Sequence, residues 1–319
     1  MMRRVLVGLD GSAFSERSLP WVRRIVPRAR IVLGGAYTPI PTGSDPWMDM
    51  GSYIFGDEEI KKYLKRAAAG MRPTPRAVIG LGSPAGVLLE LAQKEQCDLI
   101  AIASQGGAKL QRRMFGGTTE NLLHHSTVPV LVVPAAGRVP GAKERIRQIA
   151  VPLDGSKLAE SILPMAKQVA LEHGAELLLI HCFLGREQVV QLHESWGIPA
   201  LSSVLTQDLE HKVAQYRKHV ENYLEELGSR LRKQRLRAKV VCVTGSLPEG
   251  IVKAARRHRA DLFMMCAHGH GAFRHLLQGS MVGQLIQASA VPVIVQRYDA
   301  KLGRGNLRKG PSRKPGRKK

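Results

Sequence analysis

The stretch CDLIAIASQG at residues 97–106 decides the fold, because it returns as ADLFMMCAHG at residues 260–269. Working outward, Gly82 matches Gly245, Gly116 matches Gly279, and VPVLV at 128–132 matches VPVIV at 291–295, all at an offset of 163 residues. A constant offset over about 50 residues is the signature of a repeated structural unit. The sequence therefore predicts two copies of one fold in tandem.

The beginnings of the two units match as well. VLVGLDGS at residues 5–12 pairs with IAVPLDGS at 149–156, here at an offset of 144, so the second unit carries 19 extra residues in its middle. A chain of 319 residues, 44% of them apolar, is long enough for two domains. We expect unit 1 at 1–135, a Pro/Gly/Ala-rich linker at 136–146, unit 2 at 147–297 and a tail at 298–319.

Each unit alternates short apolar runs with helical patterns. Such runs are typical of buried parallel strands, and five of them alternating with helices predict an α/β fold. The expected architecture is a five-stranded, parallel, doubly wound sheet per unit, with helices on both faces, whose ligands bind beyond the carboxyl ends of the strands. In unit 2 we expect strands at 149–153, 176–183, 238–243, 262–267 and 291–296, and helices at 158–172, 208–235, 248–258 and 280–289; unit 1 follows the same plan, with a helix at 57–69.

Three loops at the carboxyl ends of strands have the character of a ligand site. They are the Asp-Gly-Ser after the first strand, a glycine turn after the fourth strand, and a glycine that opens the last helix. In unit 2, nine residues separate Gly269 from Gly279 and Ser280. A glycine lets backbone approach a ligand, and a helix N-terminus with a serine cap suits a phosphate. The alternative is that Gly279 and Ser280 only cap a helix.

Taken together, these features resemble the universal stress protein family. Gly269, nine residues, then Gly279-Ser280, followed by Val-Pro-Val, is similar to that family's ATP-binding signature, G-x-x-G-x9-G-[S/T]. The resemblance covers Arg4–Pro134 and Arg147–Gln296. It implies an adenine-nucleotide alpha-hydrolase-like fold, ATP as the ligand, with or without Mg²⁺, and a role as a stress-response or signalling adaptor.

The resemblance also implies which residues hold the nucleotide. Asp154 would face the adenosine end and Cys182 would supply backbone beside the base. The ribose and phosphates would lie against Gly269, Gly279, Ser280, Met281 and Val282. The matching positions of unit 1 are Asp10, Ala36, Gly106, Gly116, Gly117, Thr118 and Thr119.

Both units depart from the signature. Its first glycine is Ala103 in unit 1 and Cys266 in unit 2, and its Ser/Thr position is Gly117 in unit 1. The sequence therefore favours unit 2 as the nucleotide site. An enzyme, in the form of a slow ATP hydrolase, stays open as an alternative, because Asp10 and Asp154 lie in the loops where a base would be needed.

Histidine and cysteine are placed near the same loops. Cys182, Cys266 and His268 could in principle gather a metal, but neighbouring strand residues point to opposite faces and no close ligand pair anchors them. We therefore predict no metal site. The four cysteines form no C-x-x-C pair and are read as small buried side chains in a reducing cytosol. With no signal peptide and no apolar run of about 18 residues, we expect a cytoplasmic protein without a membrane span.

Positive charge is concentrated at the end of the chain. The formal net charge is +22, and residues 297–319 hold ten Lys/Arg against one acid. The tail at 298–319 is predicted to be disordered. It is either a solubilising tail or a non-specific contact to nucleic acid, and a scaffold that associates with nucleic acid or the ribosome without binding nucleotide is the alternative function. The two units are expected to pack on each other through their Val-Pro-Val strands, with a homodimer left open.

Overall fold

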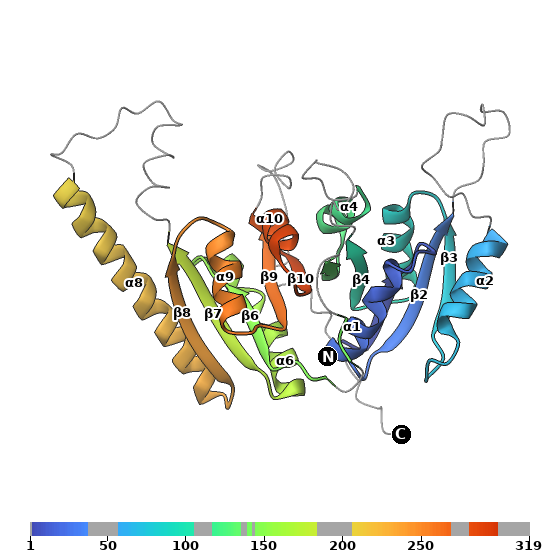
Figure 1. The fold of residues 1–319 in the computed structure, drawn as a ribbon, viewed down its shortest axis with the longest axis horizontal. Helices are drawn as coiled ribbons and strands as arrows, with labels where there is room; N and C mark the ends of the chain where they lie inside the picture. The colour runs from blue at the N-terminus through green and yellow to red at the C-terminus, as the bar shows by residue number, and fades with distance from the viewer. Residues whose placement is uncertain are drawn as a thin grey trace, which may run out of the picture.

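The computed structural model describes residues 2–37, 57–104, 117–134, 139–141, 144–183, 206–268 and 281–298. Two α/β units lie side by side, and one sheet runs through both of them (Figure 1). None of the described helices is both long and apolar enough to cross a membrane.

Unit 1 is a parallel sheet in the order β3-β2-β1-β4-β5. The first strand lies in the middle, as the doubly wound prediction requires. A short 3-10 turn at Ser15–Arg17 precedes the first helix. The strands are β1 (Arg4–Gly8), β2 (Arg30–Tyr37), β3 (Arg76–Leu81), β4 (Leu99–Ser104) and β5 (Val130–Pro134), and the helices are α1 (Ser18–Ile25), α2 (Asp57–Ala68), α3 (Pro84–Lys94) and α4 (Gly117–His125).

Unit 2 repeats this order as β8-β7-β6-β9-β10, again with parallel neighbours. Its extra length falls between the second and third strands, where the long helix α8 is found (Figure 1). The strands are β6 (Gln148–Pro152), β7 (Glu176–Phe183), β8 (Arg237–Thr244), β9 (Leu262–His268) and β10 (Val293–Tyr298), and the helices are α5 (Lys157–Glu160), α6 (Leu163–His173), α8 (Thr206–Lys233), α9 (Glu249–Arg257) and α10 (Met281–Ala288).

One predicted helix is wrong in its extent. The sequence suggested a single helix at 158–172, whereas the structure has α5 and α6 with a turn at Ser161 and Ile162 between them. Pro164 sits in the first turn of α6. Proline has no N–H to donate and its ring clashes with the preceding turn, so it suits the start of a helix and interrupts its interior.

The core consists of two apolar layers, one on each face of the sheet. Successive strand residues alternate between them, so Val5 and Val7 join one layer and Leu6 the other. Side chains of α1, α2, α6 and α8 complete the first layer, and side chains of α3, α4, α9 and α10 complete the second. Each layer contains residues of both units. The predicted placement of helices on both faces is confirmed.

The two units join along β5 and β10, which pair in the antiparallel sense. Val293 lies opposite Val132 and Ile294 opposite Leu131, and all four residues are fully buried. These are the strands with the Val-Pro-Val pattern, so the prediction that they form the contact between units is confirmed. The predicted pair of five-stranded sheets is thus continuous, as one ten-stranded sheet.

Candidate functional site

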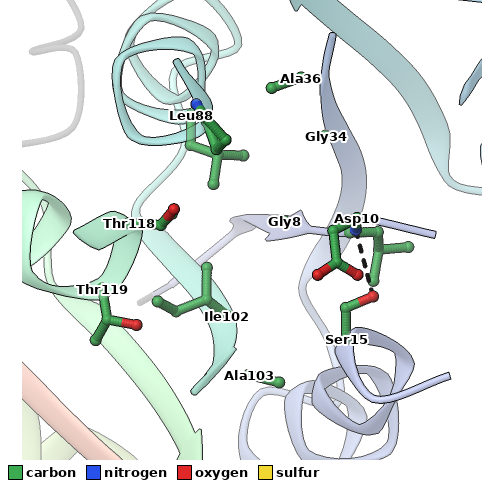
Figure 2. A pocket seen from close by; sticks show the side chains of 12 residues that line it. Gly8, Asp10, Ser15, Gly34, Ala36, Leu88, Ile102, Ala103, Thr118 and Thr119 are labelled. Atoms are coloured by element: carbon green, nitrogen blue, oxygen red, sulfur yellow. Dashed lines mark hydrogen bonds between the residues drawn. The ribbon is translucent and has the colours of Figure 1, made fainter. Parts of the chain in front are cut away.

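Unit 1 contains a cavity of about 290 Å³ at the carboxyl ends of β1, β2 and β4. β1 lies between β2 and β4, and the helices that follow β1 and β4 cover opposite faces of the sheet, so this is the switch point of the fold. Figure 2 shows the cavity from close by. Its lining residues are Gly8, Leu9, Asp10, Ser15, Gly34, Ala36, Pro84, Leu88, Ile102, Ala103, Thr118 and Thr119.

Asp10 brings a carboxylate to one side of this cavity. Its Oδ1 accepts hydrogen bonds from the Ser12 N–H at 3.0 Å and the Ser12 hydroxyl at 2.6 Å, and the left-handed Gly11 makes this turn possible. The Asp10 N–H donates to the Ser15 hydroxyl at 3.3 Å, shown dashed in Figure 2. The second carboxylate oxygen has no partner among the described residues, so it is available to accept from a ligand.

Thr118 and Thr119 lie across the cavity from Asp10 (Figure 2). Both belong to the first turn of α4, which begins at Gly117. The free N–H groups and the positive end of the dipole at a helix N-terminus favour a negatively charged group nearby. Two hydroxyls beside this helix end add further donors, so this side of the cavity suits an anion.

Two strand positions beside this cavity are glycine, and the side chains of Leu88 and Leu6 pack directly over them. A Cβ on Gly8 would lie 2.8 Å from Cδ1 of Leu88 and 3.2 Å from Cγ2 of Ile102. A Cβ on Gly34 would lie 2.9 Å from Cδ1 of Leu6. Such distances are too short for a side chain without movement of its neighbours. The walls that remain, Leu88 and Ile102, are apolar, so the cavity combines an apolar middle with a carboxylate on one side and anion-binding groups on the other.

The matching positions of unit 2 carry larger side chains. Both first strands pair with their second strands in the same register, Gly8 with Gly34 and Pro152 with Ile180. Unit 2 therefore has Pro152 and Ile180 where unit 1 has two glycines. By the same matching, Cys182 replaces Ala36 and Cys266 replaces Ala103. At all four positions the small residue belongs to unit 1.

Packing next to Cys182 shows how this space is occupied. Sγ of Cys182 lies 2.7 Å from where a Cβ of Gly250 would be. Gly250 corresponds to Val87 of unit 1, which in turn packs against Gly80. In unit 1 this contact joins Gly80 to Val87, whereas in unit 2 the valine is Val243 and the glycine is Gly250. Glycine at position 250 leaves room for the thiol of Cys182. The thiol of Cys182 is 8% exposed and lies in the apolar layer.

Of the residues predicted for unit 1, the structure brings together Asp10, Ala36, Thr118 and Thr119 as lining of the cavity. Gly117 is exposed at the start of α4. Gly106 and Gly116 lie outside the described residues. The sequence did not single out Gly8, Gly34, Ser15, Leu88 or Ile102, although glycines inside apolar strands are a signal for close approach of a ligand or a side chain.

Of the residues predicted for unit 2, Asp154 is exposed after β6 and keeps the same turn, with Oδ1 accepting from the Ser156 N–H at 2.9 Å. Cys182 and Val282 are buried, and Met281 is half-buried at the start of α10. Gly269, Gly279 and Ser280 lie outside the described residues. The described part of unit 2 therefore places Asp154 as in unit 1, and places Cys182 and Val282 in the core.

Two thiols and one imidazole near the predicted site of unit 2 lie in packed surroundings. Burial raises the pKa of the Cys182 thiol and of the Cys266 thiol, which also accepts a hydrogen bond from the Ser161 hydroxyl at 3.1 Å. Nδ1 of His181 lies 2.8 Å from the carbonyl oxygen of Leu153. No group of three or more His, Cys, Asp or Glu side chains that could hold a metal occurs within the described ranges.

Comparison with known proteins gives consistent matches over both units. The model described as "Universal stress protein family" matches residues 1–134 and 145–297. A universal stress protein of Mycobacterium tuberculosis is 25% identical over 305 residues, covering 92% of this chain and 96% of the relative. The crystal structure of a universal stress protein from Archaeoglobus fulgidus covers 95% of this chain and 97% of its own, with a TM-score of 0.62 at 19% identity. That similarity shows the fold alone.

Proposed function

Because the chain belongs to the universal stress protein family, as a tandem of two units, we propose that it binds an adenine nucleotide, ATP, in the cavity of unit 1. Occupancy of the cavity would order the adjoining loops and alter a partner surface. The protein would then act as a stress-response or signalling adaptor. Its four cysteines are free thiols, which suits the cytoplasm as its compartment.

The observation that carries this proposal is the arrangement around the 290 Å³ cavity. The free oxygen of Asp10 can accept hydrogen bonds from ribose hydroxyls. The backbone of Ala36 lies where the base would be, and the apolar walls of Leu88 and Ile102 suit a flat ring. Thr118 and Thr119 at the start of α4 would receive the phosphates. Four residues that the family resemblance assigned to the ligand line this one cavity.

The signature favours unit 2 as the binding site, whereas the smaller side chains at the matched strand positions favour unit 1. The sequence favours unit 2 because Ser280 fits the Ser/Thr position, whereas the strand positions of unit 2 are filled by Pro152, Ile180 and Cys182. Forcing additional atoms into a packed core costs about 1–3 kcal/mol. We therefore propose unit 1 as the site of tighter binding.

Binding without turnover is the reading that the cavity favours over a slow hydrolase. Asp10 is the one acid among the residues that line it, and one of its oxygens already accepts two hydrogen bonds from Ser12. A hydrolase needs a group that positions and activates water, besides the groups that hold the phosphates. A bound Mg²⁺ would be held by the phosphates, with Asp10 as the carboxylate at hand.

The proposal is tested by denaturing the purified full-length protein, identifying any released nucleotide, and titrating ATP into the stripped protein. Ala36→Leu, which places a larger side chain in the cavity of unit 1, is expected to abolish binding. The variant Gly279→Val/Ser280→Ala, which alters the signature of unit 2, is expected to retain it. Loss in the second variant alone would move the site to unit 2. Absence of binding at millimolar ATP in the wild type would leave the nucleotide-free scaffold as the function.

A further inference from the structure

A second hollow surface lies at the opposite ends of the strands from the nucleotide cavity. It consists of two grooves, of about 420 Å³ in unit 1 and about 1020 Å³ at the boundary of the units, and Arg24 lines both of them. The first groove lies beside the end of α1 and the start of β2. The second is formed by the segments that lead into β6, β8 and β9. We call the two together the basic groove.

Arginine is the residue that dominates the basic groove. Arg145, Arg147 and Arg259 line the larger part, are exposed, and form no ion pair or side-chain hydrogen bond with a described residue. Arg23 and Arg72 are exposed in the smaller part, which has no acid among its lining residues. A guanidinium is always charged and offers a planar fork of donors that matches a phosphate.

The carboxylates of the larger part are already engaged within the protein. Asp261 binds Arg24 through Oδ1 at 2.6 Å and accepts from the Arg147 and Gln148 N–H groups through Oδ2 at 2.7 and 3.1 Å. Glu176 accepts from the side-chain amide of Gln148 at 2.6 Å. Glu144 accepts from the Gly141 N–H at 3.0 Å. Hydrogen bonds from amide groups leave a carboxylate charged, but five arginines, Arg24, Arg145, Arg147, Arg237 and Arg259, line the larger part against three acids, so its net charge is positive.

A favourable interaction with the C-terminal end of a helix dipole explains only some of these arginines. Cations in the last turn of a helix are favourable there without any ligand, and Arg23 and Arg24 in α1 belong to that class. Arg145 and Arg147, however, lie in the segment before β6, outside any helix. Arg24 is held in place by Asp261, by the carbonyl oxygen of Arg145 at 2.7 Å, and by the face of Trp21 at 5.0 Å. The groove is thus organised by fixed contacts while its outer arginines stay free.

We propose that the basic groove binds the phosphodiester backbone of a nucleic acid, without selection of its sequence. Several arginines along a surface that passes from one unit to the other fit a polymer of evenly spaced phosphates better than a single small anion. None of the described residues that line either part is Phe, Tyr or Trp. The aromatic rings among the described lining residues are the imidazoles of His173 and His258, so the phosphates would supply most of the affinity. This site is separate from the nucleotide cavity and does not depend on it.

The test is a titration of a labelled DNA duplex of about 20 base pairs with the full-length protein, repeated over a series of salt concentrations. The groove variant R145Q/R147Q/R259Q is compared with K62Q/K65Q/K218Q, which removes the same charge from exposed lysines of α2 and α8. Both variants keep the basic tail at 298–319, so a difference between them reports on the groove. The circular dichroism spectrum of each variant serves as the check that it is folded.

The groove variant is expected to bind the duplex at least about 10-fold more weakly, and its plot of log affinity against log salt should be shallower by about 2–3. The lysine variant should stay within about twofold of the wild type, since its charges are remote from the groove. Equal losses in the two variants, or no loss in either, would overturn the proposal. So would displacement of the duplex by polyglutamate as effectively as by unlabelled duplex, which would indicate an acidic protein partner.

Discussion

At the scale of single residues, side-chain size at four matched positions separates the two units. Glycine at positions 8 and 34 lets Leu88 and Leu6 pack closely over the strands beside the cavity, and the matching positions of unit 2 carry Pro152 and Ile180. Glycine weakens a strand because it has no side chain to pack. Keeping two of them at the switch point therefore needs a compensating benefit, and the close packing of Leu88 and Leu6 over these positions supplies one.

Removal of the charge at Asp10 tests the carboxylate directly. Asp10→Asn keeps an oxygen for the turn with Ser12 but loses the charged acceptor, and a hydrogen bond to a charged group is worth about 1.5–3 kcal/mol. We expect ATP affinity to fall by about 10- to 100-fold by calorimetric titration. Asp154→Asn, the same change in unit 2, is the control and should alter affinity by less than about twofold. The reverse order of effects would contradict the assignment of unit 1.

The thiols provide a second test at this scale. Burial raises the pKa of Cys97 to about 12, so this thiol is protonated throughout the physiological range and gains reactive thiolate only as the pH rises towards that value. At pH 8 we expect alkylation of Cys97 by iodoacetamide to be at least about 100-fold slower than in denaturant, where the pKa returns to about 8.5. Peptide mass spectrometry measures both rates. Similar rates in the two conditions would show that Cys97 is not buried.

At the scale of elements, the repeated aspartate in the stretch that reveals the repeat has a structural explanation. Oδ2 of Asp98 accepts from the Arg3 and Arg4 N–H groups at 2.7 and 3.0 Å, and Asp261 does the same at the start of β6. Each aspartate fastens the beginning of the first strand of its unit to the beginning of the fourth. Asp261 has the additional partner Arg24, whose side chain is 6% exposed.

This difference predicts unequal effects on stability. Asp261→Ala leaves Arg24 buried without its counter-ion, and breaking a buried pair from one side costs about 3–5 kcal/mol. Asp98→Ala removes two hydrogen bonds to N–H groups and should cost about 1–2 kcal/mol. Urea denaturation of both variants measures the free energy of unfolding. Equal losses would show that the contact between Arg24 and Asp261 contributes no extra stability.

Much of the element pattern was accessible from the sequence, and the exceptions have physical reasons. Apolar runs located the five strands of unit 2, because buried parallel strands need apolar residues on both faces, and the repeat extended the same plan to unit 1. The break between α5 and α6 was missed because helical periodicity continues through Ser161, and only Pro164 marks the new start. The sequence did not predict that the glycines Gly8 and Gly34 would lie beside a cavity in unit 1, because the signature consists only of loop glycines and a hydroxyl. Which unit has space depends on side chains in neighbouring strands, such as Gly34 and Ile180.

At the scale of the whole molecule, the tandem behaves as one body in its packing. The pairing of β5 with β10 carries both apolar layers from one unit to the next. Further contacts cross the boundary, since Nε2 of His173 lies 2.8 Å from the carbonyl oxygen of Ile25 and Arg297 donates to the carbonyl oxygen of His124. The two ligand surfaces proposed here lie at opposite ends of the strands of this shared sheet.

Such continuity predicts that the units unfold together. Hydrogen exchange of the central strands, β1 in unit 1 and β6 in unit 2, should report free energies of opening that agree within about 1 kcal/mol. Both strands are buried in layers that contain residues of the two units. Exchange of one strand through an opening that leaves the other protected would contradict this, and would mean that the junction is weaker than either core.

The stoichiometry of ATP binding to the full-length chain is the most direct test of the central claim. The signature is present in some form in both units, but the matched strand residues are smaller in unit 1, so we expect a single nucleotide per chain. Ala36→Leu should remove that nucleotide while leaving the fold intact. Two nucleotides per chain, or one that persists in Ala36→Leu and is lost in Gly279→Val/Ser280→Ala, would contradict the claim that the cavity of unit 1 is the binding site.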